Sequence, residues 1–224
     1  MTYVFQFGAV WRELDALLLG AWLTVRLSAI AMVIGLLVGI AGAQAKASRF
    51  RAIRGLAQAY VEAIRNTPFL VQLLLIYLGL PSIGIRLTPD QAALTAMVVN
   101  LGAYATEIIR AGIESVPHGQ IEAGRALGLK PWPIFRFIVL MPALRAVFPA
   151  LSSQFILIML ASSVVSVISA EELTAVADTI VARNVRSFEF YLAVTAIYLA
   201  LSLAFQSVLA TIDHLLFSRW GERT

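Results

Sequence analysis

Apolar residues occur in long, nearly uninterrupted blocks along the chain, and short polar segments rich in charge, glycine or proline separate them. A helix needs about 20 mostly apolar residues to cross the roughly 30 Å of hydrocarbon in a bilayer. Five blocks approach or exceed this length. The pattern therefore predicts an all-α membrane protein with five transmembrane helices, at about residues 17–43, 60–80, 91–113, 137–168 and 190–217.

The residues before the first block are aromatic and then charged, and the charges are Arg12, Glu13 and Asp15. A cleavable signal peptide has a different order, with basic residues in front of an apolar core. Aromatic and charged side chains together are typical of a helix that lies at the membrane surface. We therefore expect three regions: an interfacial segment at residues 1–16, a transmembrane domain at 17–217 and a cytoplasmic tail at 218–224.

Composition supports a membrane environment and narrows the chemistry. Hydrophobic residues make up 60% of the 224 residues and charged residues only 13%, about half the roughly 25% of a soluble domain. With no cysteine and two histidines, a disulfide framework is excluded and we expect no metal site. The chain also lacks the G-x-x-x-x-G-K-[ST] pattern that cradles phosphates. We therefore expect no ATP hydrolysis and no bound cofactor in this chain.

The basic residues are distributed unevenly between the two sides of the predicted membrane domain. If the polar loop at about residues 44–59 is cytoplasmic, 12 of the 17 lysines and arginines lie on that side and four on the other, with Arg26 inside the first span. Cytoplasmic loops of membrane proteins carry such an excess. We therefore expect the N-terminus outside and the C-terminus in the cytoplasm, and a net charge of +4 that needs no nucleic acid to explain it.

One long connection, residues 111–142, is patterned rather than merely polar. Ser115 or His118 is placed to cap a helix that begins near Gly119, and Gly128 is placed where the chain would leave it. A proline-rich turn and a second amphipathic stretch follow. Two short helices that meet at a bend would form a projecting knob, suited to a groove on a partner protein. A loop lying on the membrane surface is the alternative, and the pattern alone leaves both open.

The sequence GQIEAGRALGL at residues 119–129 closely resembles the EAA loop of integral-membrane subunits of ABC importers. RNTPFLVQLLLIYLGLP (65–81), GAYATEIIRAGIESVPHGQIEAGRALGL (102–129) and ALRAVFPAL (143–151) are similar to the polar amino-acid permeases of the histidine/glutamine/arginine type. These pieces follow the order of that family. The resemblance implies the five-helix core of a type I, MetI-like importer.

The resemblance also implies a function and partners. The chain would be the transmembrane subunit of an ATP-driven importer of polar amino acids in the bacterial cytoplasmic (inner) membrane. A cytoplasmic ABC ATPase dimer would hold ATP and Mg, and a second permease subunit, the same chain or a paralogue, would complete the pathway. A periplasmic or lipid-anchored amino-acid-binding protein would deliver the solute. The residues implied in coupling to the ATPase, at about 114–136, are Gln120, Glu122, Ala123, Gly124, Ala126 and Gly128.

The loop departs from the pattern of the family it resembles at two positions. Gly124 replaces the usual alanine, and both residues are small, so we expect docking to be little affected. Met141 stands where that family has a proline, which follows here as Pro142. The second change moves a kink at the entry to a helix by one residue.

Polar residues inside the predicted spans are candidates for a substrate pathway because they are costly in lipid. Asn100, Tyr104 and Glu107 share one face of the third span. They line the pathway or form a hydrogen-bond cluster between helices, with Glu107 paired to Arg110 or Arg145. In the fourth span we expect one face to carry Ser162, Ser166 and Ser169, with Ser163 beside it, for packing or for binding.

The identity of the solute is less constrained. Many similar permeases carry a Lys-Asp pair before the serines of the fourth span, where this chain has Leu160 and Ala161. We therefore expect a solute whose side chain is not strongly cationic, or a site held by a partner subunit. A related compound such as an opine is an alternative. An ion-gradient transporter would show inverted repeats, which the sequence does not. The polar segment 170–190 is either a solvated loop helix or a docking surface for the binding protein.

Overall fold

The computed structural model describes residues 5–184 and 186–218, and every regular element within these ranges is a helix. The α-helices are α1 (Gly8–Arg12), α2 (Leu14–Lys46), α3 (Arg51–Arg65), α4 (Phe69–Leu74), α5 (Pro89–Glu114), α6 (His118–Ala126), α7 (Pro131–Pro133), α8 (Leu140–Ala161), α9 (Leu173–Asn184) and α10 (Ser187–Phe217). Tighter or wider helical turns extend them: η1 (Leu75–Gly79), η2 (Leu80–Ile83), η3 (Ile134–Val139) and η4 (Ser162–Ile168).

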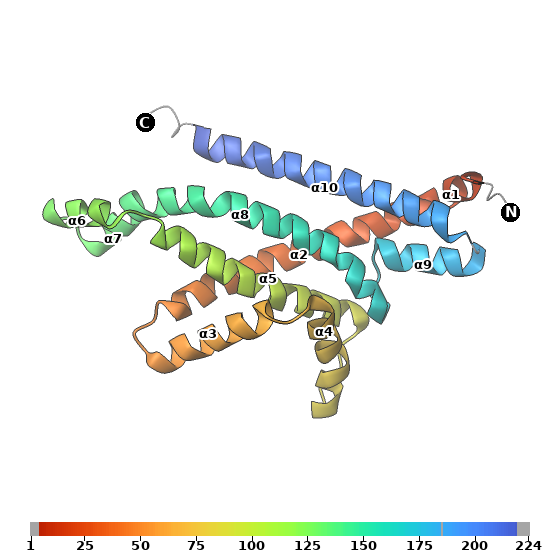
Figure 1. Cartoon of the computed structure of the whole chain (residues 1–224), viewed down its shortest axis with the longest axis horizontal. Coiled ribbons are helices and arrows are strands. Elements are labelled where there is room, and N and C mark those ends of the chain that lie inside the picture. The colour runs from red at the N-terminus through yellow and green to blue at the C-terminus, as the bar shows by residue number, and fades with distance from the viewer. Residues whose placement is uncertain (1–4, 185, 219–224) are drawn as a thin grey trace.

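Four helical stretches of the described chain are long and apolar enough to cross a membrane. They are α2, α5, the continuous segment Pro131–Ile168 that contains α8, and α10. These stretches run along the length of the molecule, with α10 at one edge (Figure 1). They match four of the five predicted spans, although α2 is longer than expected and reaches Lys46.

The prediction of a continuous helix over residues 60–80 is wrong. The chain turns by 112° between Arg65 and Phe69, and in Figure 1 α4 points away from the bundle in which α3 lies. Pro68 cannot donate a hydrogen bond and disfavours helical geometry at the residue before it. The side-chain amide of Asn66 donates to the Glu62 carbonyl oxygen over 2.8 Å, which helps to close α3. The second span is therefore a bent pair of helices.

Helices α2 and α5 form the most intimate contact of the described fold, because small residues line it. A Cβ atom added to Gly35 would lie 2.8 Å from a side-chain carbon of Leu101. At Gly39 it would overlap Ala105. The two backbones therefore lie as close as glycine allows, and no larger side chain fits between them.

A second hydrophobic cluster lies at the opposite end of the molecule from α6, where α9 packs on α2 and α10. Leu17 of α2 and Leu173 and Ala177 of α9 are fully buried in it. Polar residues beside them are buried too: the side chains of Glu172 and Glu189 have no exposed surface. The segment 170–190 therefore includes a helix, as expected, but that helix is packed on one side rather than solvated all round.

Candidate functional site

Helix α6 lies within the segment that resembles a coupling loop, and it begins at His118, close to the expected start. The predicted capping is wrong, because Pro117 occupies the N-cap position and no side chain caps the helix. The hydroxyl of Ser115 instead donates to the Gly112 carbonyl oxygen over 2.7 Å. The proline fixes the backbone before the helix, so the chain can enter α6 without a side-chain acceptor.

Helix α6 ends as the sequence predicts, at a glycine with left-handed backbone geometry. Gly128 has a φ angle of 76°, which L-residues with a side chain rarely adopt. The next amide, that of Leu129, donates to the Gly124 carbonyl oxygen over 3.1 Å. Together these features turn the chain from α6 toward α7 and the rest of the knob.

The knob is held together on one side of α6 and exposed on the other. Gly124 is buried against η3, and a Cβ atom added there would lie 2.6 Å from the terminal carbon of Ile138. The glycine thus lets α6 pack more closely on η3 than alanine would, a contact that the sequence alone did not predict. The other residues expected in coupling are exposed on the knob: Gln120, Glu122, Ala123, Ala126 and Gly128.

Asn100 takes part in a hydrogen-bond cluster at the bend between α3 and α4. Its side chain is 8% exposed, and its amide donates to the side-chain oxygen of Gln72 over 3.0 Å. The amide of Gln72 in turn donates to the carbonyl oxygens of Ile64 and Thr67 over 2.7 and 3.0 Å. Of the two alternatives for Asn100, this geometry favours the cluster between helices.

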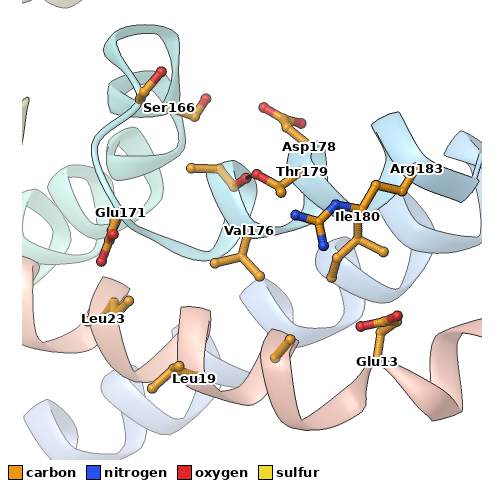
Figure 2. A pocket seen from close by; sticks show the side chains of 13 residues that line it. Glu13, Leu19, Leu23, Ser166, Glu171, Val176, Asp178, Thr179, Ile180 and Arg183 are labelled. Atoms are coloured by element: carbon orange, nitrogen blue, oxygen red, sulfur yellow. Dashed lines mark hydrogen bonds between the residues drawn. The ribbon is translucent and has the colours of Figure 1, made fainter.

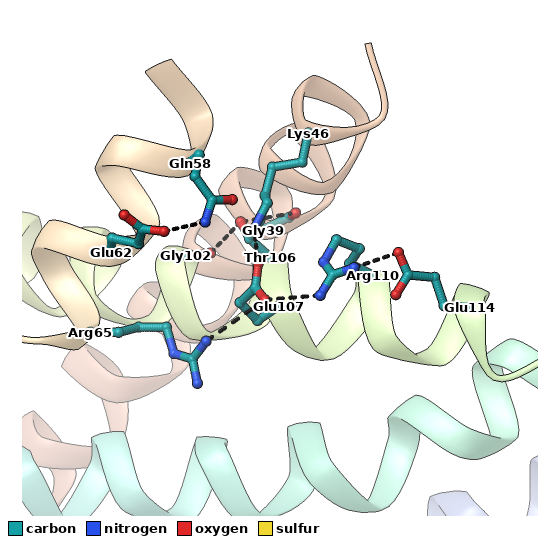
Figure 3. Close-up of polar contacts among 10 residues, drawn as sticks. All are labelled: Gly39, Lys46, Gln58, Glu62, Arg65, Gly102, Thr106, Glu107, Arg110 and Glu114. Carbon is teal, nitrogen blue, oxygen red and sulfur yellow. Dashed lines mark hydrogen bonds and ion pairs between the residues drawn. The ribbon is translucent and has the colours of Figure 1, made fainter. Parts of the chain in front are cut away.

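Glu107 is the centre of an ion-pair cluster that joins three helices (Figure 3). It pairs with Lys46 of α2, with Arg110 on its own helix at 3.3 Å and with Arg65 of α3 at 3.8 Å. Pairing with Arg110 was one expected alternative and is confirmed. Lys46 and Arg65 were not anticipated, because only the tertiary packing of α2 and α3 on α5 brings them close.

A cleft of about 310 Å³ lies beside this cluster, where α3 faces α5 and the end of α2. The Arg65 guanidinium carbon lies 5.5 Å from the ring centroid of Tyr104, so the cation sits over the aromatic face. Two of the predicted pathway residues, Tyr104 and Glu107, thus share one cleft, and Asn100 does not line it. The lining residues are Lys46, Gln58, Val61, Glu62, Arg65, Asn66, Tyr104 and Glu107.

The serines of the fourth span do not share a face as expected. From Ser162 the chain winds as the tighter 3₁₀ helix η4, whose side chains repeat every three residues. Ser162 is buried, with its hydroxyl bonded to the Met159 carbonyl oxygen at 2.7 Å. Ser163 bonds in the same way to Leu160 at 2.9 Å. Both hydroxyls therefore donate to a backbone carbonyl oxygen of the same helical segment.

A second cavity, of about 660 Å³, opens between α2 and α9 (Figure 2). Leu19 and Leu23 of α2 form one wall, and Val176 and Ile180 of α9 form the other. The polar residues on its lining carry charge of both signs or hydroxyl groups: Glu13, Ser166, Ser169, Glu171, Asp178, Thr179 and Arg183. Ser166 and Ser169 thus face this cavity rather than the buried side that holds Ser162.

Sequence reasoning missed the hydrogen-bond network at Glu172, next to this cavity. Its carboxylate accepts from the Tyr198 hydroxyl at 2.5 Å, the Ala175 amide at 2.8 Å and the Thr24 hydroxyl at 3.4 Å. The one available signal was its place directly before α9, since a carboxylate is stabilised at a helix N-terminus. Within the described residues, no group of histidine, cysteine, aspartate and glutamate side chains is arranged to hold a metal ion.

Comparison with known proteins identifies the family. Residues 31–217 match the family model of the binding-protein-dependent transport system inner membrane component. The chain is 34% identical to the glutamine transport system permease GlnP of Escherichia coli K12, over 93% of this chain and 96% of that one. It is 39% identical to the L-cystine permease TcyB of Bacillus subtilis strain 168, over 74% and 70% of the two chains.

Two solved structures agree with this assignment. The crystal structure of an amino acid ABC transporter with histidines superposes with a TM-score of 0.89 at 37% identity, over 95% of this chain and 99% of that chain. The MetNI methionine ABC transporter shares the fold, with a TM-score of 0.76 at 19% identity over 92% and 98% of the two chains. The chain therefore belongs to the family of binding-protein-dependent transport system inner membrane components, as a MetI-like permease subunit of an amino acid ABC importer.

Proposed function

We propose that this permease moves a polar amino acid into the cytoplasm by alternating access, driven by a separate ABC ATPase dimer that docks on α6. The arrangement of α6 is the observation that supports this proposal. The helix presents an exposed polar face, while its buried Gly124 packs against η3. A helix fixed on one side and free on the other can transmit a partner's movement to the helices that follow it.

The same proposal assigns the sides of the membrane. The end of the bundle that carries α6 lies in the cytoplasm, and the N-terminus and α9 lie outside in this assignment. The excess of lysine and arginine on the α6 side supports it. The mixed charges around the cavity at α9 suit a transient contact with a solute-binding protein, because complementary charge speeds encounter. The membrane is the bacterial cytoplasmic membrane, as for a permease of this family.

The pathway lies along the face of α5 that carries Tyr104 and Glu107, between this chain and a second permease subunit, the same chain or a paralogue. Five helices are few to enclose a pathway by themselves, which favours a paired arrangement. The polar groups of Ser162, Ser163 and Asn100 are hydrogen-bonded within the protein. In this proposal they stabilise the helices beside the pathway rather than contact the solute. ATP and Mg are held by the ATPase, and this chain supplies no catalytic group.

We propose a solute whose side chain is not strongly cationic. Relatives carry the names of glutamine and L-cystine permeases, and Leu160 and Ala161 provide no charge where similar permeases have a Lys-Asp pair. An opine is the competing candidate, because a relative in Rhizobium meliloti is named an octopine permease, and octopine keeps the cationic guanidinium group of arginine. Uptake of radiolabelled L-glutamine, measured with unlabelled amino acids or opines as competitors, distinguishes the two candidate solutes. Efficient uptake of arginine would contradict the proposal.

The coupling role of α6 predicts that a bulky residue on its exposed face separates ATP hydrolysis from transport. We expect Glu122→Trp to assemble in the membrane but to lower ATP-dependent L-glutamine uptake by about tenfold or more, because the docking surface no longer fits its partner. Uptake and ATPase activity are measured in proteoliposomes that contain the partner subunits. Arg51→Trp, exposed at the same end of the molecule, is the matched control. Full uptake by Glu122→Trp contradicts the role of α6.

A further inference from the structure

The cleft between α3 and α5 has the charges of a site for a free amino acid. Its walls carry two cationic side chains, Lys46 and Arg65, and two anionic ones, Glu62 and Glu107. A volume of about 310 Å³ lies at the lower end of the roughly 300–1,000 Å³ of small-molecule pockets. An equal number of charges of each sign suits a ligand that is itself a zwitterion.

Arg65 has hydrogen-bonding capacity that the described fold does not use. Its ion pair with Glu107 spans 3.8 Å, and its guanidinium donates no hydrogen bond to any described residue. The side chain is 43% exposed. A guanidinium presents its N–H groups as a planar fork that matches a carboxylate. The stacking on Tyr104 holds this fork at the cleft and leaves its edge open.

Glu62 complements Arg65 from the same helix. The two residues are three positions apart, so their side chains lie on one face of α3. They nevertheless form no ion pair with each other, and Glu62 forms none with any other described residue. One of its carboxylate oxygens accepts a hydrogen bond from Gln58. The ammonium and carboxylate of an amino acid are attached to one carbon, so a neighbouring anion and cation that do not neutralise each other match both groups at once.

We infer that this cleft is an amino-acid site at the α6 end of the permease. Arg65 holds the α-carboxylate of the solute, Glu62 holds its α-ammonium group, and Tyr104 covers it. A chain of ion pairs runs from Glu107 at the cleft through Arg110 to Glu114 at the end of α5, shortly before α6. The site therefore receives the solute on the side where it is released. This inference rests on the proposed function, since it takes the solute to be an amino acid.

The native chain contains no cysteine, so a single introduced thiol reports on the cleft without background. Gln58→Cys places that thiol on the cleft wall, and its reaction with a maleimide is followed in inside-out vesicles that contain the whole transporter. Millimolar L-glutamine is expected to slow the reaction. L-Glutamine methyl ester lacks the carboxylate and N-acetyl-L-glutamine lacks the ammonium group, so neither is expected to protect. Leu56→Cys, which is exposed on α3 and does not line the cleft, is the matched control.

Variants of the two recognition residues test the assignment directly. Arg65→Gln or Glu62→Gln, combined with Gln58→Cys, is expected to raise the L-glutamine concentration for half-protection by about tenfold or more, since each removes a charge-assisted hydrogen bond. Arg54→Gln on the same helix, outside the cleft, should leave it unchanged. Equal protection by the ester and the N-acetyl compound overturns the site.

Three further outcomes are decisive. Protection by glycerophosphoethanolamine, but not by L-glutamine, would make the cleft a lipid headgroup site and would also overturn the inference. ATP-dependent uptake of L-glutamine without any protection of Gln58→Cys rejects the site while the proposed function stands. Absence of amino-acid uptake altogether rejects the proposed function itself.

Discussion

At the scale of single residues, Glu172 ties three helices together at one point. Its carboxylate accepts from Thr24 of α2, from Tyr198 of α10 and from the Ala175 amide of α9. The side chain of Glu172 is fully buried, so water cannot take the place of its carboxylate as the acceptor for these donors. A buried donor that loses its acceptor costs about 1–3 kcal/mol. Glu172 therefore contributes to the stability of the end of the molecule that α9 covers.

Replacing Glu172 by alanine should lower the apparent unfolding temperature of the purified permease in detergent, through a loss of about 1–3 kcal/mol. Glu172→Gln keeps one oxygen acceptor and should lose less. The neighbouring Glu171 is exposed, so Glu171→Ala should change stability by at most about 0.5 kcal/mol. Equal unfolding temperatures for Glu171→Ala and Glu172→Ala would show that the network does not stabilise the fold.

At the scale of elements, the bend between α3 and α4 depends on side-chain hydrogen bonds as well as on Pro68. Gln72 of α4 donates back to the end of α3 and accepts from Asn100 of α5. Backbone groups freed at a break in a membrane helix need such partners. The bend is thus built by contacts among α3, α4 and α5 rather than by local sequence alone.

A double-mutant cycle tests this view of the bend. Gln72→Ala and Asn100→Ala should each destabilise the permease, and the double variant should be less destabilised than the sum by roughly 0.6 kcal/mol or more, a value typical of hydrogen bonds between membrane helices. Unfolding in mixed detergent gives the energies. Ser115→Ala, remote from the bend, should add to Gln72→Ala within about 0.5 kcal/mol. An additive Gln72–Asn100 cycle would refute the coupling.

The elements also show what a sequence can predict. Four apolar blocks became single long helical segments, and Gly128 ended α6, because length, hydropathy and backbone freedom are local properties. The bend at Pro68 was not predicted, because the mean hydropathy of an apolar block is the same whether or not the helix is broken within it. The pairing of Lys46 with Glu107 was not predicted for another reason: the two residues are 61 positions apart in the sequence, and only the packing of α2 on α5 brings them together.

At the scale of the whole molecule, the two ends of the bundle differ in chemistry. One end carries the ion pairs of Glu107 and the knob at α6. The other carries α9 with its cavity of mixed charge. This polarity fits a protein that meets an ATPase on one side of a membrane and a binding protein on the other, and it makes the orientation open to test.

Single cysteines in the cysteine-free chain should react with a membrane-impermeant maleimide from opposite sides. Arg49 precedes α3 and Thr179 lies on α9, and both are exposed. We expect Arg49→Cys to be labelled in inside-out vesicles and Thr179→Cys in intact spheroplasts, because basic loops remain cytoplasmic. The reverse labelling pattern would invert the proposed orientation, and detergent-solubilised protein serves as the control for full reactivity.

The glycine-lined contact of α2 with α5 has a mechanical consequence. Two helices whose backbones touch cannot slide or tilt separately without a clash, so α2 and α5 form one rigid unit. By contrast, only 6% of the most apolar stretch of α10 is buried against the rest of the described chain. In the proposed alternating-access cycle we therefore expect α2 and α5 to move as one unit, with the relative movement around α10 and between the two permease subunits.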